Sequence, residues 1–108
     1  MDTTGIKKWV KALRSGEFKQ ARRVFTTKFM EPINPGYCCL GVAGELGFGD
    51  SEESVCRALG IPEYEDKLIG LNDERRYSFP SIANWIEKYI LKIEPSGAKA
   101  KPVKRKGK

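Results

Sequence analysis

The spacing of apolar residues near the start of the chain predicts an amphipathic helix. Its apolar positions are Ile6, Trp9, Val10 and Leu13. They recur at i, i+3, i+4 and i+7, the period that places side chains on one face of a helix. Thr3 or Thr4 precedes the run and suits the N-cap, and Gly16 marks its expected end. We therefore expect a first helix with one buried face and one basic face.

The stretch from residue 17 to residue 36 has no clear helical period. RRVFTTKFM mixes β-branched and aromatic residues, which favour extended structure, and EPINPG is typical of a turn. Two interpretations stay open here. One is a short β ribbon near residues 21–36, and the other is a helix over residues 17–24.

Helical spacing returns in residues 37–46. Gly41 and Gly44 within this segment would let another backbone approach closely. Cys38 and Cys39 are adjacent, and neighbouring side chains in a helix point about 100° apart. Because free cysteine is among the most buried residue types, we interpret both as small packing residues rather than as a reactive or metal-binding pair.

Two shorter helical segments follow. Asp50 or Ser51 can cap a helix with carboxylates in its first turn, and Gly60 ends it. Residues 62–71 form another short helical piece that carries apolar side chains towards its end.

The last helix is predicted to begin at Ser78, after a turn at Asn72 and Asp73. Pro80 is tolerated because it lies in the first turn of that helix. The apolar stripe consists of Ile82, Trp85, Ile86, Tyr89 and Ile90. The final stretch, AKAKPVKRKGK, has no apolar periodicity, which predicts a disordered tail.

Together these elements predict a mainly α fold of about four short helices, packed as one globular domain over residues 1–94. Residues 95–108 are the predicted disordered basic tail. No run approaches the ~20 apolar residues of a membrane-spanning helix, and the N-terminus does not resemble a signal peptide. We therefore expect a cytoplasmic protein without a membrane partner, and the oligomeric state stays open.

The net charge of +6 is unevenly distributed along the chain. Residues 1–30 hold eight basic and two acidic residues, whereas residues 31–97 hold six basic and twelve acidic residues. Residues 98–108 hold six basic and no acidic residues. The order is basic, acidic, basic, so the predicted domain without its tail is close to neutral.

The absence of histidine limits the chemistry. The chain has three cysteines and no histidine, which excludes Ser-His-Asp and Cys-His catalysis and histidine-ligated zinc. No phosphate-binding glycine loop or nucleophile elbow occurs either. We expect no enzyme activity, no cofactor and no metal ion.

Basic residues supply the binding candidates. Arginines with aromatic or polar neighbours form the ligand- or partner-binding set: Arg22, Arg23, Phe25, Asn72, Asp73, Arg75, Arg76 and Tyr77. The first helix and the tail supply candidate phosphate contacts: Lys7, Lys11, Arg14, Lys104, Arg105 and Lys106. For the phosphate contacts, a solvated helix face and a solubilising tail are the alternatives.

Three stretches, KKWVKALRSGEFKQ, YCCLGVAGEL and LIGLNDERRYSFPSIANWIEKY, resemble in this order a group of small bacteriophage and prophage proteins. The resemblance covers about residues 7–90. It departs from the family pattern at Ala21, where a glycine is common, and at Ala43 and Gly44, where a second small residue or cysteine is common. No activity comes with the resemblance.

The resemblance implies a setting in which small proteins without catalytic residues act by binding. We therefore expect a non-enzymatic, phage-type accessory protein that binds and blocks or sequesters a host factor. A host protein, such as a host-defence component, or a small nucleotide signal would be the partner. The alternative is a nucleic-acid-binding accessory protein that uses its basic tail and basic first helix, with non-specific contacts through the tail.

Overall fold

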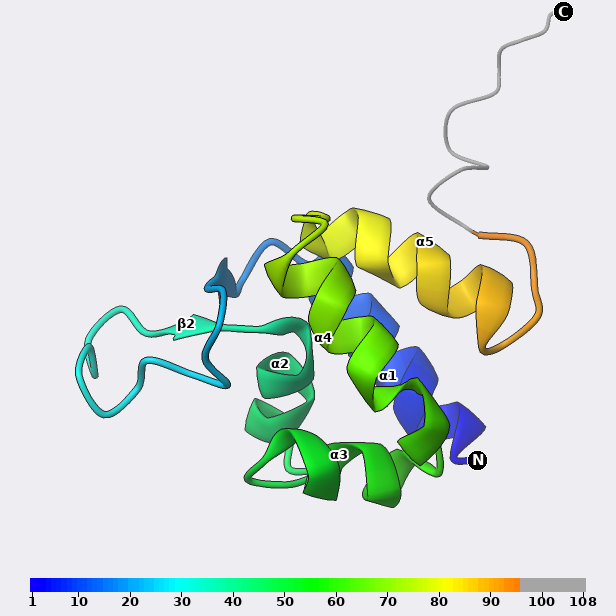
Figure 1. Cartoon of the computed structure of the whole chain (residues 1–108), viewed down its shortest axis with the longest axis horizontal. Helices are drawn as coiled ribbons and strands as arrows, with labels where there is room; N and C mark the ends of the chain where they lie inside the picture. The colour runs from blue at the N-terminus through cyan, green and yellow to red at the C-terminus, as the bar shows by residue number, and fades with distance from the viewer. Residues whose placement is uncertain (96–108) are drawn as a thin grey trace, which may run out of the picture.

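Five α-helices and one short pair of parallel strands form the part of the chain that the computed structural model describes, residues 1–95 (Figure 1). The helices are α1 Thr3–Arg14, α2 Cys39–Glu45, α3 Glu52–Leu59, α4 Glu65–Asp73 and α5 Phe79–Tyr89, with a 3₁₀ turn, η1, at Pro62–Tyr64. The prediction of a mainly α fold is confirmed. The predicted tail lies, apart from Pro95, outside the described residues.

The core of the domain forms around α2. Residues 39–43 are all buried, and α2 contacts α1, α3 and α4, while α1 and α5 pack side by side. The predicted apolar stripe of α1 is buried, and Trp9 is fully inaccessible. The indole Nε1 of Trp9 donates a hydrogen bond of 2.8 Å to the carbonyl of Cys39. That bond gives the buried indole N–H the partner it needs and fixes α1 against α2.

The caps of the helices agree with the sequence in most places. Ser51 and Ser78 cap α3 and α5, and Gly60 ends α3 in the left-handed conformation with φ 74°. At α1 the predicted threonine cap is wrong. Asp2 is the N-cap, because its carboxylate accepts a hydrogen bond of 2.9 Å from the backbone N–H of Gly5.

The two strands lie at either end of the segment that was predicted to form a ribbon. β1, Lys19–Gln20, pairs in parallel with β2, Gly36–Tyr37. The helix alternative over residues 17–24 is wrong, since none of these residues is helical. Between the two strands the chain leaves the helices and projects from the domain, as the cyan segment of Figure 1 shows.

Asn72 and Asp73 do not form the predicted turn. They are the last residues of α4, and Asn72 is fully buried. The reversal of the chain follows at residues 74–77, where the backbone N–H of Tyr77 donates to the carbonyl of Leu71 at 2.9 Å. Arg76 takes the left-handed conformation there, with φ 58°.

Candidate functional site

The carboxamide of Asn72 joins three distant parts of the chain. Its Oδ1 accepts hydrogen bonds from Gln20 Nε2 at 2.8 Å and from the backbone N–H of Cys39 at 3.2 Å. Its Nδ2 donates to the carbonyl of Ala21 at 2.9 Å and to Asp73 Oδ1 at 2.8 Å. All four hydrogen-bonding positions of the amide are therefore used. Asn72, a sequence-predicted binding residue, holds the site together and is too deeply buried to touch a ligand.

This network joins residues from three stretches that are distant in the sequence. Gln20 comes from the first of the three resembling stretches, Cys39 from the second and Asn72 from the third. The stretches meet inside the protein, where a buried polar group without a partner would be costly. Gln20, Cys39 and Asn72 therefore meet a structural requirement of this fold.

Around Asn72, residues 20–23 lie against residues 72–77. Asp73 Oδ1 accepts a hydrogen bond of 2.9 Å from the backbone N–H of Arg23, and Gln20 Nε2 also donates to the carbonyl of Tyr77 at 2.9 Å. Arg22 Nη2 lies 3.4 Å from the carbonyl of Arg76, a long hydrogen bond. The arginines brought together here, Arg22, Arg23, Arg75 and Arg76, are named the arginine junction below.

Two residues of the arginine junction have a strained backbone. Arg23 and Arg76 have φ values of 67° and 58°, in the left-handed region that residues with a Cβ rarely adopt. Both carry side chains exposed to solvent. Such conformations persist only where the surroundings impose them, and they gather at binding sites.

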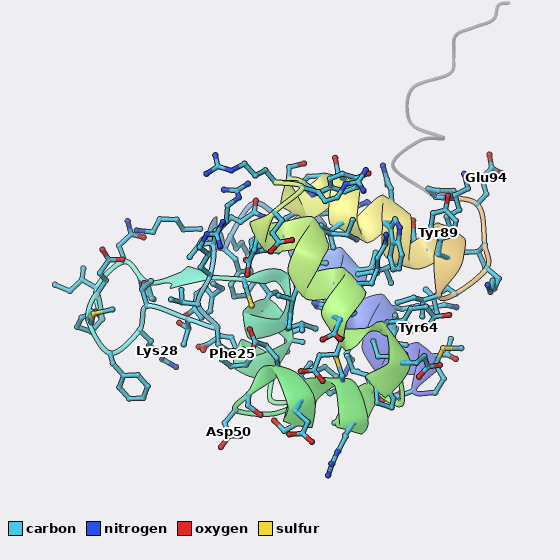
Figure 2. The ribbon with its side chains drawn as sticks, in the orientation of Figure 1. Phe25, Lys28, Asp50, Tyr64, Tyr89 and Glu94 are labelled. Atoms are coloured by element: carbon cyan, nitrogen blue, oxygen red, sulfur yellow. The ribbon has the colours of Figure 1, made fainter. Side chains whose placement is uncertain are left out.

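Phe25 lies apart from the arginine junction, against α2. Its carbonyl accepts a hydrogen bond of 3.1 Å from the backbone N–H of Cys38. A Cβ on Gly41 would overlap that same carbonyl oxygen, and a Cβ on Gly44 would lie 2.6 Å from Phe25 Cζ. The expectation that these glycines allow close backbone approach is confirmed. Figure 2 labels Phe25 at this position.

Phe25 also lines a surface cavity of about 520 Å³. Tyr37 contributes to its wall, and Lys28 and Glu45 form an ion pair of 2.9 Å beside it. The hydrogen bond that Lys28 Nζ donates to Glu45 raises the pKa of Lys28, with smaller contributions from the charges of Glu45 and Tyr37. The cavity lies next to the base of the projecting segment, and both aromatic and charged side chains line it.

Residues 28–35, named the tip loop below, expose three apolar side chains that the sequence-based set missed. Phe29 is 96% exposed, Met30 78% and Ile33 98%. No helical period runs through this stretch, and its apolar residues stand among prolines and polar residues. That combination was the available signal, because an apolar residue inside a turn-rich stretch has no regular element to bury it.

The base of the tip loop is tightly bonded. Thr27 is its centre: its backbone N–H donates to the carbonyl of Gly36 at 2.9 Å, and its Oγ1 accepts from the N–H of Gly36 at 2.7 Å. The same Oγ1 donates to Glu31 at 2.9 Å, and the carbonyl of Thr27 accepts from the N–H groups of Met30 and Glu31. The base of the loop is therefore fixed by hydrogen bonds while its apolar side chains face water.

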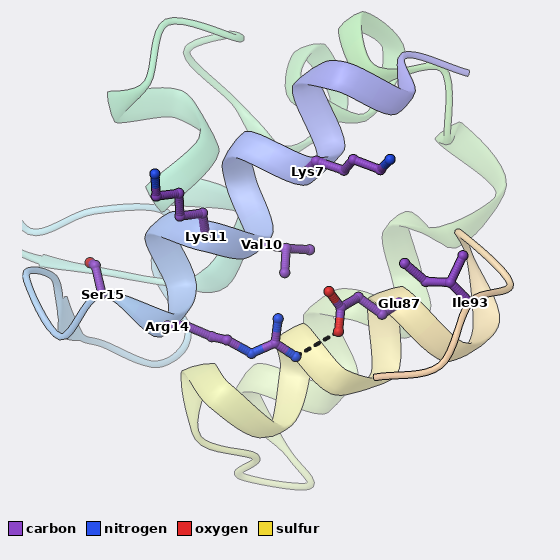
Figure 3. A pocket seen from close by; sticks show the side chains of 7 residues that line it. All are labelled: Lys7, Val10, Lys11, Arg14, Ser15, Glu87 and Ile93. Carbon is purple, nitrogen blue, oxygen red and sulfur yellow. Dashed lines mark hydrogen bonds and ion pairs between the residues drawn. The ribbon is translucent and has the colours of Figure 1, made fainter. Parts of the chain in front are cut away.

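The predicted phosphate contacts on α1 face a groove between α1 and α5, shown in Figure 3. Lys7, Lys11 and Arg14 help to line a cavity of about 580 Å³ there. Arg14 makes a 2.7 Å ion pair with Glu87 and donates to Asn84 at 2.5 Å. The Arg14 charge is therefore neutralised inside the protein, whereas both lysines are exposed. Lys104, Arg105 and Lys106 lie outside the described residues.

The three cysteines are buried, as predicted. Cys38 is 4% exposed, and Cys39 and Cys56 are fully inaccessible. Burial raises the pKa of the Cys38 thiol to about 11 and that of Cys56 to about 12, and it raises the pKa of Cys39 as well. Cys38 Sγ also accepts the N–H of Gly41 as the α2 cap. At neutral pH these thiols are protonated and unreactive.

Within residues 1–95, no group of three cysteine, aspartate or glutamate side chains is arranged to hold a metal ion. No helix in that same part of the chain is long and apolar enough to span a bilayer.

A family model described as "Domain of unknown function (DUF8296)" matches residues 1–58, more than half of the chain. The matched part includes α1, the tip loop, α2 and all of α3 but its last residue. No curated protein and no solved structure matches the chain.

Proposed function

The chain belongs to the DUF8296 family, and from the tip loop of this member we propose a non-enzymatic protein that binds another protein. The observation that carries the proposal is the near-complete exposure of Phe29 and Ile33, with Met30 beside them. Leaving such a side chain in water forgoes about 1.5–3 kcal/mol relative to its burial. A partner that covers all three would recover that free energy.

The base of the tip loop supports binding by a preformed element. The hydrogen bonds of Thr27 with Gly36 and Glu31 fix the loop before any partner arrives. A fixed loop loses less conformational entropy on binding than a mobile one. Phe29 and Met30 are also residue types that are enriched at the centres of protein interfaces. The matching surface on the partner is an apolar groove.

The proposed biological role is to block or sequester a host factor. The chain lacks histidine, and its thiols are buried and protonated, so its residue chemistry favours binding over turnover. The resemblance to phage and prophage proteins supports a bacterial protein, such as a host-defence component, as the partner.

The test uses two matched double variants. Phe29→Ser with Ile33→Ser removes the apolar surface of the tip loop, and Tyr89→Ser with Ile93→Ser removes exposed apolar surface from the opposite end of the domain. Each full-length protein is coupled to a resin and exposed to bacterial lysate. Any retained protein is then purified and titrated by calorimetry. We expect a stoichiometric complex with the wild type and the control, and a loss of at least about 100-fold in affinity for the tip-loop variant.

Two results would contradict the proposal. The first is a purified partner that binds the tip-loop variant as tightly as the wild type. The second is concentration-dependent self-association that disappears in the tip-loop variant, which would make a second copy of this chain the occupant. Sedimentation velocity of the isolated protein distinguishes that second case.

Binding of nucleic acid by the basic first helix and the tail is a second candidate function. The exposed side chains of Lys7 and Lys11 on α1 favour it. Affinity for a DNA duplex would then fall steeply with salt, and deletion of residues 98–108 would remove most of it.

A further inference from the structure

We propose that the arginine junction is a binding site for phosphate groups, separate from the tip loop. Four arginines lie on two backbone segments that contact each other, residues 20–23 and residues 72–77, and the guanidinium group of Arg22 reaches the carbonyl of Arg76 across that contact. Guanidinium is the side chain best shaped for phosphate, because its planar fork donates two parallel hydrogen bonds to two oxygens. The ligand class is a nucleotide phosphate, either in a free nucleotide or in the backbone of a single strand.

The charges of the arginine junction are only partly balanced by the protein. Within residues 1–95, none of its four arginines forms an ion pair with a carboxylate within 4.0 Å. Asp73 lies close by, but its Oδ1 already accepts from the backbone N–H of Arg23 and from Asn72 Nδ2. Asp73 and the adjacent Glu74 supply two carboxylates to four arginines, so an excess of positive charge remains, and a bound anion would offset it.

The guanidinium group of Arg22 gives a second, independent indication of a phosphate site. Its Nε is buried and has no hydrogen-bond partner within the described part of the chain, and its Nη2 makes only the 3.4 Å bond to Arg76. A buried N–H donor without an acceptor is costly. Phosphate oxygens placed against this guanidinium group would supply the missing acceptors.

The backbone conformation of the arginine junction also supports a binding site. Arg23 and Arg76 are the two left-handed residues of the loops that meet here, where glycine would be less strained. Asp73 fixes the backbone of Arg23 by its 2.9 Å hydrogen bond. The two loops thus hold an arginine in an unfavourable conformation at each side of the contact.

The test measures binding of pyrophosphate to the full chain by calorimetry at low salt, with ¹⁵N NMR to locate the site. We expect amide shifts concentrated at residues 22–23 and 74–77. Arg75→Ala with Arg76→Ala should weaken binding at least about tenfold, since each lost charge-assisted hydrogen bond accounts for about that factor. Lys7→Ala with Lys11→Ala removes the same charge from the α1–α5 groove and should change affinity less than about twofold.

A single substitution separates loss of binding from loss of folding. Arg76→Gly keeps the left-handed backbone without strain, so it should melt about 4 °C or more above Arg76→Ala. Both variants should lose pyrophosphate binding to the same extent. A glycine variant that is more stable and still binds like the wild type would overturn the proposal, as would shifts confined to Lys7 and Lys11.

Two further titrations distinguish the sources of phosphate. ATP and a single-stranded oligothymidylate are each compared with pyrophosphate, using the wild type and the arginine double variant. A free nucleotide as the ligand predicts tight ATP binding with a weak salt dependence. A nucleic acid strand predicts tighter oligonucleotide binding whose logarithm falls linearly with the logarithm of salt concentration. Binding of both probes that the arginine substitutions leave unchanged would assign phosphate recognition to another part of the chain.

Discussion

Gln20 and Asn72, 52 positions apart, are joined side chain to side chain by a hydrogen bond of 2.8 Å. The bond connects β1 to the end of α4, and Asn72 extends it to α2 through the backbone of Cys39. One buried amide therefore sets the position of the arginine junction relative to the helical core. The local order of this surface depends on a residue that no ligand reaches.

Asn72→Asp should destabilise the domain by at least about 2 kcal/mol at neutral pH. A carboxylate keeps the bonds from Gln20 and Cys39 but cannot donate to the carbonyl of Ala21, and it places a second negative charge beside Asp73. Urea unfolding measures the change. Asn34→Asp, on the exposed tip loop, should shift the free energy of unfolding by less than about 0.5 kcal/mol. Equal effects of the two substitutions would show that Asn72 has no such role.

Two ion pairs of equal length should contribute differently to the free energy of unfolding, because one is more buried than the other. Arg14–Glu87 and Arg57–Glu53 both measure 2.7 Å, but the Glu87 side chain is 9% exposed and that of Glu53 64%. Glu87→Ala removes the carboxylate that pairs with the partly buried Arg14 guanidinium and should cost about 3 kcal/mol. Glu53→Ala should cost about 0.5 kcal/mol or less. Chemical denaturation of both variants checks the difference, and similar losses would refute the dependence on burial.

Gly41→Ala should loosen the base of the projecting segment. The added Cβ would overlap the carbonyl of Phe25, which accepts the N–H of Cys38, so that strand-like contact must open. Amide hydrogen exchange at Cys38 and Thr27 should become faster, with a stability loss of about 2 kcal/mol. Gly70→Ala is the matched control, because a Cβ there meets nothing within 4 Å. Unchanged exchange at Cys38 in Gly41→Ala would count against the contact.

Stability should fall as pH rises above about 9. The pKa of the Cys38 thiol is raised from about 9 to about 11 by burial, so the unfolded chain releases this proton first. The stabilisation is complete below pH 9 and is lost as the pH rises towards 11, at about 1.4 kcal/mol per pH unit. Urea unfolding at pH 8 and pH 10 should show a smaller loss for Cys38→Ala than for the wild type. Equal losses would mean that the thiol does not contribute.

The helices could be predicted from the sequence because their signals are local. Apolar spacing gave the buried face of α1, and the caps at Ser51, Gly60 and Ser78 depend on residues within one helical turn. Asn72 shows where local signals end. Asparagine is typical of turns, but three partners from distant segments keep it helical and buried.

The candidate site could be predicted only by residue type. Arginines with polar neighbours identified Arg22 and Arg76, but their contact across 54 positions depends on the packing of β1 against α4. Phe25 was grouped with them because it is close in sequence. Phe25 instead packs against α2, because Gly41 and Gly44 leave room there for its backbone and ring. The sequence signalled exposed apolar residues in the tip loop but not the shape of the loop, which depends on Thr27 bonds that close it outside the core.

The paired strands also bear on how this domain tolerates change. β1 and β2 bring Lys19 opposite Gly36, so the chain leaves and re-enters the helical body at neighbouring points. Doubling the length of a loop with joined ends costs only about 0.6 kcal/mol in closure entropy. Insertions or replacements within the tip loop, residues 28–35, would therefore leave the helices nearly untouched, whereas Gln20, Ala21 and Phe25 must stay because they contact α4 and α2. The same helical domain can therefore carry tip loops of different sequence and length. A change of binding specificity at the tip loop would not require a change of fold.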